Sequence, residues 1–150
     1  MLENTFSTRP AKKGDEKRMA EIEKLSFPRP WSEKAFYDEI VNNNIAIYVV
    51  AEADGLVVAY AGVWIVVDEG YITQIAVHPD YRGRGIGEAV VAAMLEEAES
   101  RGAASQTLEV RESNLKAQAL YRKLGFIPAG LRYGFYEDNG ENAVIMWRRP

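Results

Sequence analysis

The stretch IAVHPDYRGRGIGEAVV, residues 75–91, joins an apolar run to a helical pattern through a loop rich in glycine and arginine. Ile75, Ala76 and Val77 indicate the end of a strand, and the apolar periodicity that starts at Ile86 predicts a helix. A loop that only reverses the chain needs one glycine, whereas this loop has three at alternate positions. A strand, a glycine-rich loop and a helix N-terminus together form an anion site, because free backbone amides point at the ligand.

The kind of anion follows partly from what the loop lacks. Position 88 is Glu88, so the dinucleotide pattern Gly-x-Gly-x-x-Gly fails, and no Gly-Lys-Ser/Thr follows as in a Walker A loop. The remaining pattern, Arg/Gln-x-x-Gly-x-Gly/Ala, is met by Arg82, Gly83, Arg84, Gly85, Ile86 and Gly87. The alternative is an ordinary strand-to-helix turn with solvated arginines, but the three glycines and two cations favour phosphate binding.

Length and charge set the broad class. The 150 residues have the length of one domain with a full core, and we expect a single domain over residues 1–150. Residues 1–14 are polar and mixed in charge, so we expect a flexible segment there and no secretory signal. Since no apolar run approaches the roughly 20 residues of a membrane span, we expect a cytoplasmic protein without a membrane partner. The net charge of −4 argues against nucleic acid as the main ligand.

Cysteine and histidine usage narrows the chemistry. The sequence contains no cysteine, which excludes disulfides, thiolate metal sites and a cysteine-linked covalent intermediate. Its single histidine, His78, excludes a histidine-rich metal site, and a serine–histidine–acid triad would have to use this residue. Because His78 precedes Pro79 at a strand end, we expect a solvent-facing turn residue. We therefore expect no metal, and carboxylates and tyrosines remain as proton carriers.

Hydrophobic periodicity and turn residues predict the elements. Helices are expected over residues 15–25, 33–42, 86–101 and 115–124, with Ser32 and Asn114 as N-caps, and strands over 45–53, 56–67, 71–77, 105–111 and in two halves of 130–147. The order is two helices, a three-strand meander, strand–helix repeats and a last hairpin. This order predicts an α/β (α+β) fold with one mixed, mostly antiparallel sheet and a parallel step around the central helix.

Two polar side chains stand within apolar elements. Glu109 lies between Leu108 and Val110, so strand alternation places it on the opposite face, which is either solvated or part of a cleft. The pattern alone favours the solvated face. Tyr121 lies on the apolar stripe of its helix, which is typical of a core tyrosine whose hydroxyl reaches the surface.

Four segments together resemble the GNAT family of N-acetyltransferases. They are FPRPWS (27–32), the glycine-rich stretch 75–91, LEVRESNLKAQALYRKLGF (108–126) and YEDNGENAVIMW (136–147). The resemblance begins at about residue 15 and is strongest from 75 to 147. It implies the GNAT fold, in which helices flank the sheet and the parallel strands splay at an acetyl-CoA site.

The resemblance also implies how acetyl-CoA would be held. The backbone amides of residues 82–87 would bind the pyrophosphate, with the two arginines in a supporting role. The backbone of Ile75, Ala76 and Val77 would hydrogen-bond the pantetheine arm, and an amide near Val77 would polarise the thioester carbonyl. The side chain of Asn114 would contact acetyl-CoA in addition to capping its helix.

Reaction roles and the acceptor are likewise implied by the resemblance. Glu109 matches the general base of the family and Tyr121 the general acid, in a direct transfer within a ternary complex. The similarity is greatest to members that acetylate the N-terminal alanine of a small-subunit ribosomal protein. Trp31, Tyr133 and Tyr136 are then candidates for binding the peptide, although simple packing explains them equally well.

One position departs from the family pattern, and two other functions stay open. Phe135 stands where relatives commonly have a tyrosine, so a hydroxyl is missing there. The same acetyl-CoA machinery would serve an acetyltransferase for a small-molecule amine. A non-catalytic acyl-CoA-binding module is the third reading, and the presence of Glu109 and Tyr121 counts against it.

Overall fold

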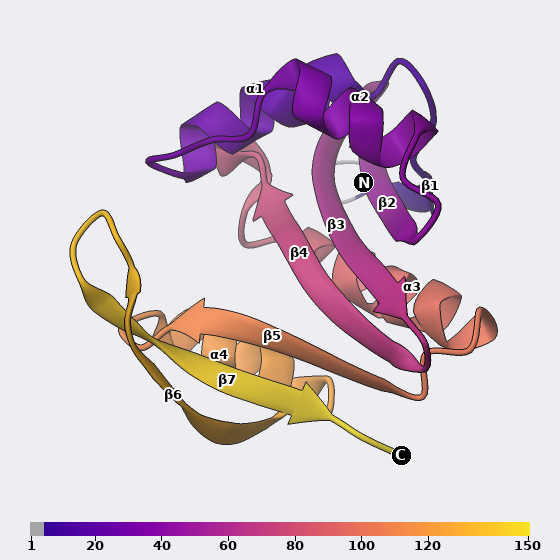
Figure 1. The fold of residues 1–150 in the computed structure, drawn as a ribbon. Helices are drawn as coiled ribbons and strands as arrows, with labels where there is room; N and C mark the ends of the chain where they lie inside the picture. Colours follow the sequence, from indigo (N-terminus) through magenta and orange to yellow (C-terminus); the bar gives the residue numbers. More distant parts are fainter. Residues whose placement is uncertain (1–4) are drawn as a thin grey trace.

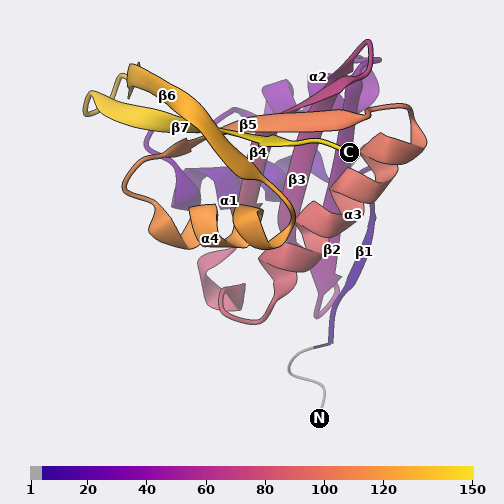
Figure 2. The same ribbon diagram turned by 90° about the horizontal axis from the view of Figure 1, so that it is seen from below.

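A computed structural model describes residues 5–150, which form one seven-stranded sheet with helices on both faces (Figure 1, Figure 2). In chain order the elements are β1 (Ser7–Pro10), α1 (Glu16–Ser26), α2 (Glu33–Val41), β2 (Ala46–Ala53), β3 (Leu56–Val66), β4 (Glu69–Val77), a 3₁₀ turn (Pro79–Tyr81), α3 (Ile86–Ser100), β5 (Ser105–Arg111), α4 (Leu115–Lys123), β6 (Ile127–Tyr136) and β7 (Glu141–Arg148). The predicted helices, hairpin and later strands are confirmed, with ends that shift by a few residues.

The strand order is β1-β2-β3-β4-β5-β7-β6, and every neighbouring pair is antiparallel except β4 and β5. The parallel pair arises because α3 carries the chain back along the sheet between these two strands. The mixed, mostly antiparallel sheet and its parallel step are therefore as expected.

The parallel pair is short, and the sheet opens beyond it. Only Glu69–Tyr71 of β4 pairs with β5, at Ser105–Thr107, and the two strands then diverge into a V (Figure 1). On its other side β4 carries a bulge against β3, where Thr73 and Gln74 together oppose Gly62. A Cβ on Gly62 would lie 2.2 Å from the Tyr48 ring, so this glycine is needed for the ring to pack there.

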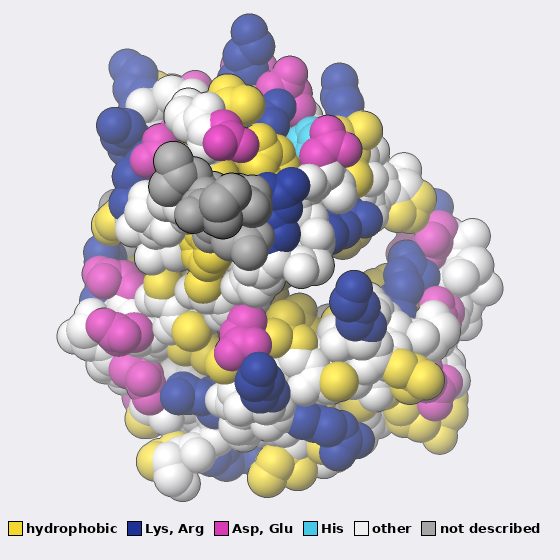
Figure 3. Space-filling model, turned by 180° about the vertical axis from the view of Figure 1, so that it is seen from behind, with side chains coloured by type: hydrophobic (Ala, Val, Ile, Leu, Met, Phe, Trp, Pro, Cys, Tyr) yellow, Lys and Arg dark blue, Asp and Glu magenta, His cyan; other side chains and the backbone are white. Residues whose placement is uncertain are grey.

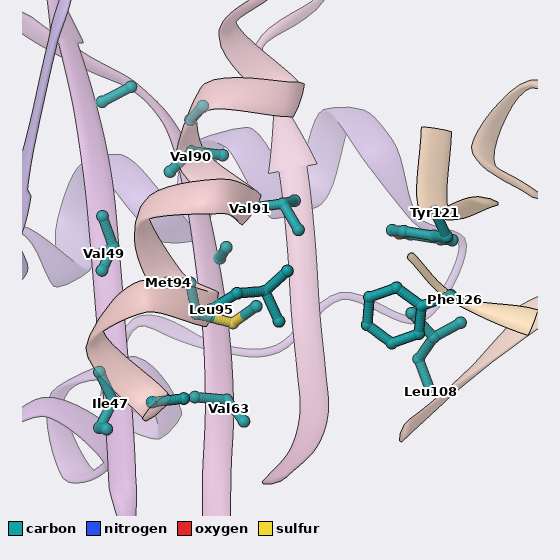
Figure 4. Close-up of a cluster of buried hydrophobic side chains, with 14 of the residues drawn as sticks. Ile47, Val49, Val63, Val90, Val91, Met94, Leu95, Leu108, Tyr121 and Phe126 are labelled. Carbon is teal, nitrogen blue, oxygen red and sulfur yellow. The ribbon is translucent and has the colours of Figure 1, made fainter. Parts of the chain in front are cut away.

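Two hydrophobic cores hold the helices on the sheet. On one face, α1 and α2 pack on β2–β4 around Met19, Ile22, Phe36, Val50 and Tyr60, all fully buried. On the other face, α3 packs on β2 and β3, and α4 packs on β5 and β7. The side chains labelled in Figure 4 belong to this second core: Ile47, Val49, Val63, Val90, Val91, Met94, Leu95, Leu108, Tyr121 and Phe126.

Local hydrogen bonds explain why the helices begin where the sequence predicts. The Ser32 hydroxyl accepts the N–H of Ala35 at 3.0 Å, and the Asn114 side chain accepts the N–H of Ala117 at 3.0 Å. Both residues are therefore N-caps, as expected. The ring centroids of Trp31 and Phe36 lie 5.5 Å apart across the start of α2.

The N-terminal strand was not predicted. Ser7–Pro10 pairs antiparallel with β2, and the Arg9 guanidinium binds Asp15 at 2.8 Å and Glu52 at 3.0 Å. A four-residue polar strand carries no apolar periodicity, so the pattern offered no signal for it. Residues 7–10 of the segment expected to be flexible form this strand, and residues 1–4 lie outside the described part of the chain. None of the helices within residues 5–150 is long and apolar enough to cross a membrane.

Candidate functional site

A cleft of about 490 Å³ opens where β4 and β5 diverge. Figure 3 shows a hollow at one side of the molecule with Lys and Arg side chains near its rim. The cleft is lined by Glu23, Phe27, Pro28, Arg29, Trp31, Ile72, Thr73, Gln74, Ile75, Leu108, Glu109, Val110, Arg111, Asn114, Ala117, Tyr121, Phe135, Tyr136, Glu137 and Asp138. These residues come from α1, β4, β5, α4, β6 and the loops beside them.

The cleft passes through the sheet. Leu108 and Val110 of β5 belong to the core on the α3–α4 face, and Tyr121 lies on that side too. Glu109 and Arg111 alternate with them and face the side of α1 and the β6–β7 hairpin. Two ligands can therefore approach from opposite faces and meet between the splayed strands.

The glycine-rich loop leads directly into α3. Gly83 and Gly85 have φ angles of +78° and +80°, a region that residues with a Cβ seldom adopt. Gly85 is the N-cap of α3 and has no side chain to accept the first helical N–H groups. Those amides are therefore free to bind an external anion, and the helix dipole adds to the attraction. The residues present thus fit a pyrophosphate.

The two arginines of the loop are exposed, and each also contacts the protein. Arg82 donates from Nε to the Val77 carbonyl at 3.0 Å and from its terminal nitrogen to the Ser26 hydroxyl at 3.3 Å. Arg84 donates to the Asp80 carbonyl at 3.2 Å, and its guanidinium lies 4.9 Å from the centre of the Tyr81 ring. These contacts brace the loop against β4 and the end of α1.

The end of β4 uses side chains and backbone for different purposes. Ile75 lines the cleft, while Ala76 is 7% exposed and packs in the core under α1. A Cβ on Gly87 would lie 3.4 Å from the Val77 side chain, so α3 starts close against this strand. β5 does not pair with this part of β4, which leaves its edge open toward the cleft.

Glu109 lies in the cleft, so the reading of a solvated sheet face is wrong. Its carboxylate is half-buried, and Oε2 lies 3.3 Å from Nε of Arg132 on β6. The splay of β5 from β4 creates the cavity into which this side of β5 faces. Strand alternation found the correct face, but it could not show that the neighbouring strand is missing there.

Tyr121 is 9% exposed and lines the same cleft from α4. Its ring meets Phe126 edge to face, with ring centroids 5.9 Å apart. Figure 4 shows the two rings side by side. Burial raises the pKa of Tyr121 to about 12, so its hydroxyl stays protonated at neutral pH. Burial also raises the pKa of Tyr136 to about 12, and the Arg111 guanidinium lies 4.0 Å from the centre of that ring.

The structure brings only some of the other predicted site residues to the cleft: Ile75 lines it, whereas Ala76, Val77 and residues 82–87 are not among the residues that line it. Asn114, Trp31 and Tyr136 all line the cleft. Tyr133 is 81% exposed and is not among the lining residues. The expectation of a solvent-facing His78 is wrong, because its side chain is only 14% exposed and its Nδ1 accepts the Asp80 N–H at 3.1 Å.

Three features of the cleft were not predicted. Glu23 of α1 is fully buried at its edge. Arg29 and Glu137 form an ion pair at 3.1 Å between the loop after α1 and the β6–β7 hairpin. Arg111 binds Asp138 at 3.0 Å beneath the same hairpin. A buried charge within the apolar pattern of α1 was a usable signal for Glu23, whereas the two ion pairs join residues far apart in sequence.

Within the described residues, no group of three or more His, Cys, Asp or Glu side chains is placed to hold a metal ion. The site can instead supply the Glu109 carboxylate as a proton acceptor and the Tyr121 phenol as a proton donor. The backbone amides at the start of α3 can bind an anion.

Comparisons with known proteins place the chain in a family. The profile of the acetyltransferase (GNAT) family matches residues 16–126. An Escherichia coli (strain K12) protein named ribosomal protein bS18-alanine N-acetyltransferase is 39% identical over 127 residues, which cover 83% of this chain and 84% of that protein. A Bacillus subtilis (strain 168) protein, whose name assigns it the same activity provisionally, is 46% identical over 127 residues, or 85% of this chain and 84% of the relative.

A solved structure extends the likeness to the fold. The crystal structure of the ribosomal-protein-S18-alanine N-acetyltransferase from Escherichia coli matches with a TM-score of 0.87 and 34% identity. The match covers 96% of this chain and 93% of that chain. The fold is thus shared over nearly the whole length of both chains.

Proposed function

The chain belongs to the acetyltransferase (GNAT) family and is an acetyl-CoA-dependent N-acetyltransferase, and from this premise we propose that it acetylates the N-terminal alanine of a small-subunit ribosomal protein. Relatives named for this activity on bS18, the RimI type, align with more than four fifths of the chain. The observation that carries the proposal is the cleft through the sheet, with Glu109 and Tyr121 on its walls. A peptide N-terminus is slender enough to enter such a passage from the face opposite the cosubstrate.

Most of the residues that would hold acetyl-CoA lie between the end of β4 and the start of α3. The amides of residues 82–87 would bind the pyrophosphate, with Arg82 and Arg84 adding positive charge nearby. The unpaired edge of Ile75–Val77 would hydrogen-bond the pantetheine arm, and Asn114 would contact it across the cleft. When bound there, acetyl-CoA supplies an acetyl group activated as a thioester.

Two side chains would move the protons. A peptide α-ammonium has an ordinary pKa of roughly 7.7 to 8.0, so a carboxylate can accept its proton directly or through one water. Glu109 would take that proton, and the neutral amine nitrogen would then bond to the acetyl carbon and lose its second proton to solvent. Tyr121 would donate its proton to the sulfur as the carbon–sulfur bond breaks. A backbone amide near Val77, at the open edge of β4, would stabilise the negative charge that develops on the carbonyl oxygen of the thioester.

The peptide would enter between the loop after α1 and the β6–β7 hairpin. Trp31 and Tyr136 line the cleft from these two sides, and both would contact the first residues of the peptide. Tyr133 lies outside the cleft and would contact only a longer peptide. Phe135 borders the cleft without a hydroxyl, so it offers an apolar surface there.

A thiol-release assay with acetyl-CoA tests the proposed acceptor. The panel contains peptides that differ only in their first residue, each followed by the same basic sequence, with an N-terminally blocked alanine peptide as control. We expect the free alanine peptide to show the highest kcat/KM and the blocked peptide to release no thiol.

Small amines provide the opposing outcome. If polyamines or aminoglycosides are acetylated and none of the peptides is, the chain is a small-molecule acetyltransferase. If coenzyme A binds but no amine releases thiol, the chain is a binding module. Either result contradicts the proposal.

A further inference from the structure

We infer that Glu23 of α1 is a positioning residue that holds the peptide side and the acetyl-CoA side of the cleft in place at once, acting through Trp31 and Gln74. The inference rests on the proposed function for the peptide side and on the family's use of acetyl-CoA for the other. Glu23 touches neither substrate, because its side chain has no exposed surface.

The contacts of Glu23 reach three parts of the fold. Its Oε2 accepts the backbone N–H of Trp31 at 3.1 Å and a hydrogen bond from the side-chain amide of Gln74 on β4. Its Oε1 accepts a hydrogen bond from the Tyr60 hydroxyl on β3. One carboxylate therefore ties α1 to both strands and to the loop that precedes α2.

Burying the Glu23 carboxylate costs desolvation free energy, which hydrogen bonds must offset. Burial raises the pKa of Glu23, and the three donors partly offset that effect by stabilising the charged form. Apolar residues of similar volume usually fill a buried site with less desolvation cost. What an apolar residue lacks is the ability to accept several hydrogen bonds at one point, and three donors converge on Glu23.

The acetyl-CoA side depends on Gln74 because β4 has lost its partner there. Beyond Tyr71 the strand no longer pairs with β5, and Thr73 and Gln74 form the bulge opposite Gly62. The bulge sets the direction of the next three residues, Ile75–Val77, the first of which lines the cleft. The hydrogen bond from Gln74 to Glu23 fixes the bulge to α1.

The peptide side depends on Trp31 because its loop has few donors. Pro28 and Pro30 carry no N–H group, so the segment between α1 and α2 can be anchored through the backbone at only a few residues. Glu23 binds two of them: its carbonyl accepts the Phe27 N–H at 3.0 Å, and its side chain accepts the Trp31 N–H. The position of the Trp31 ring in the cleft follows from these bonds.

A pair of matched variants tests this role. Glu23→Met keeps the length of the side chain and removes the acceptors, and Glu39→Met does the same to a second buried carboxylate. Glu39 is 9% exposed, accepts bonds from Tyr48, Trp64 and Asn43, and does not line the cleft. Both variants should lower the melting temperature, so the control separates loss of stability from loss of positioning.

The expected result is a raised KM with an unchanged shape of the pH profile of kcat. Loss of the three hydrogen bonds should shift both walls of the cleft, and a small shift strongly reduces how well bound groups are positioned. Glu23→Met should therefore raise KM for acetyl-CoA and for the alanine peptide by about tenfold or more. The pH profile of kcat should keep its shape, since Glu23 moves no proton in the reaction. In Glu39→Met both KM values should stay within about twofold of the wild type, because Asn43, Tyr48 and Trp64 do not line the cleft and the bond between Tyr48 and Thr73 remains.

A conservative variant should restore part of the effect. Glu23→Gln keeps one acceptor oxygen, which can turn toward Trp31 and Gln74 while its amide faces the Tyr60 hydroxyl. Its KM values should lie between those of the wild type and Glu23→Met. If Glu23→Met and Glu39→Met lower the melting temperature equally and leave both KM values unchanged, Glu23 is only structural and the inference is wrong.

Two further measurements keep the test decisive. If Glu23→Met does not fold, Gln74→Leu removes only the bond to β4, and it should raise KM for acetyl-CoA more than KM for the peptide; an unchanged KM for acetyl-CoA contradicts the inference. If the wild type acetylates no peptide, the proposed function fails, but calorimetric binding of acetyl-CoA still tests Glu23 and Gln74. Weaker binding in both variants and normal binding in Glu39→Met supports the role on that side.

Discussion

The loop at residues 82–87, proposed to bind acetyl-CoA, and the walls formed by the loop after α1 and the β6–β7 hairpin, proposed to bind the peptide, are the two ends of the proposed site, and they are built differently. The loop offers backbone amides that positive-φ glycines and a helix start leave free. The walls consist of side chains that meet from distant parts of the chain, as Arg29 and Glu137 do at 3.1 Å. A backbone site depends on local sequence, whereas a side-chain site depends on how the chain folds back on itself.

Because they are built differently, the two ends are suited to different kinds of ligand. A pyrophosphate presents the same oxygens in every acetyl-CoA molecule, so a site of amides is sufficient and tolerant of neighbouring residues. A peptide differs from others by its side chains, so discrimination needs shaped and charged walls. Variants at the two ends should therefore affect different kinetic constants, and variants between them should affect the chemical step.

The largest effect, on kcat, is expected at Tyr121 in the wall of the cleft. Tyr121→Phe removes the hydroxyl and keeps the ring against Phe126, so kcat should fall by about a hundredfold while acetyl-CoA affinity stays nearly unchanged. Because the pKa of Tyr121 is raised to about 12, the hydroxyl remains protonated at neutral pH, and its loss as an acid should reduce activity only above about pH 11. Steady-state kinetics over a range of pH measures both.

A matched tyrosine variant serves as the control. Tyr37→Phe changes a residue of α2 that does not line the cleft, and kcat should stay at the wild-type value. Equal kcat in Tyr121→Phe and the wild type would remove Tyr121 from the reaction and leave the cleft without its acid.

A smaller effect, confined to acetyl-CoA, is expected at the loop. Gly85→Ala meets no atom within 4 Å, so its cost comes from the φ of +80° alone. It should lower stability by about 1 kcal/mol because a residue with a Cβ disfavours this conformation. By shifting the amides at the start of α3, it should also raise KM for acetyl-CoA about tenfold, or about 1.4 kcal/mol of binding free energy.

The other end of α3 supplies the control for this variant. Gly102 has a φ of +96° and also meets no atom within 4 Å. Gly102→Ala should lose similar stability in urea unfolding and keep the wild-type KM for acetyl-CoA. If the two variants raise KM equally, the start of α3 is not the anion site.

The sequence was informative about the backbone site for the same reason that the site is local. Three alternate glycines, an N-cap position and a helical pattern lie within seventeen consecutive residues, and each has a known effect on nearby backbone. The main elements followed from periodicity and turn residues, and the parallel step followed from the order of the elements. The short parallel pairing and the resulting cleft did not, because no local pattern shows where two strands part.

The side-chain site was only partly predictable. Resemblance pointed to Glu109 and Tyr121, and both line the cleft, but the pattern of β5 favoured a solvated face for Glu109. The burial of His78 depends on how the turn after β4 packs, which its neighbours in sequence do not determine. The convergence of donors on Glu23 likewise joins residues up to 51 positions apart.

The smallest effect is expected at the peptide walls. Arg29→Met breaks the exposed ion pair with Glu137, which contributes less than about 1 kcal/mol to stability. KM for the alanine peptide should change by about threefold, and KM for acetyl-CoA should not change, since surface charges mainly affect how a charged ligand approaches. The change should shrink as salt is raised.

An exposed pair elsewhere is the comparison for Arg29. Lys34→Met breaks the pair with Asp38 on α2, at 2.9 Å, and should alter neither KM. A change in KM for acetyl-CoA but not for the peptide in Arg29→Met would show that the two ends of the proposed site are assigned the wrong way round.

The site of acetylation tests the central claim most directly. The wild-type enzyme is incubated with acetyl-CoA and one peptide that carries both a free N-terminal alanine and internal lysines, and tandem mass spectrometry locates the acetyl group. We expect acetylation of the alanine α-amine and of no lysine. Acetylation of lysine side chains, or an unmodified peptide in a reaction where a small amine is acetylated, would contradict it.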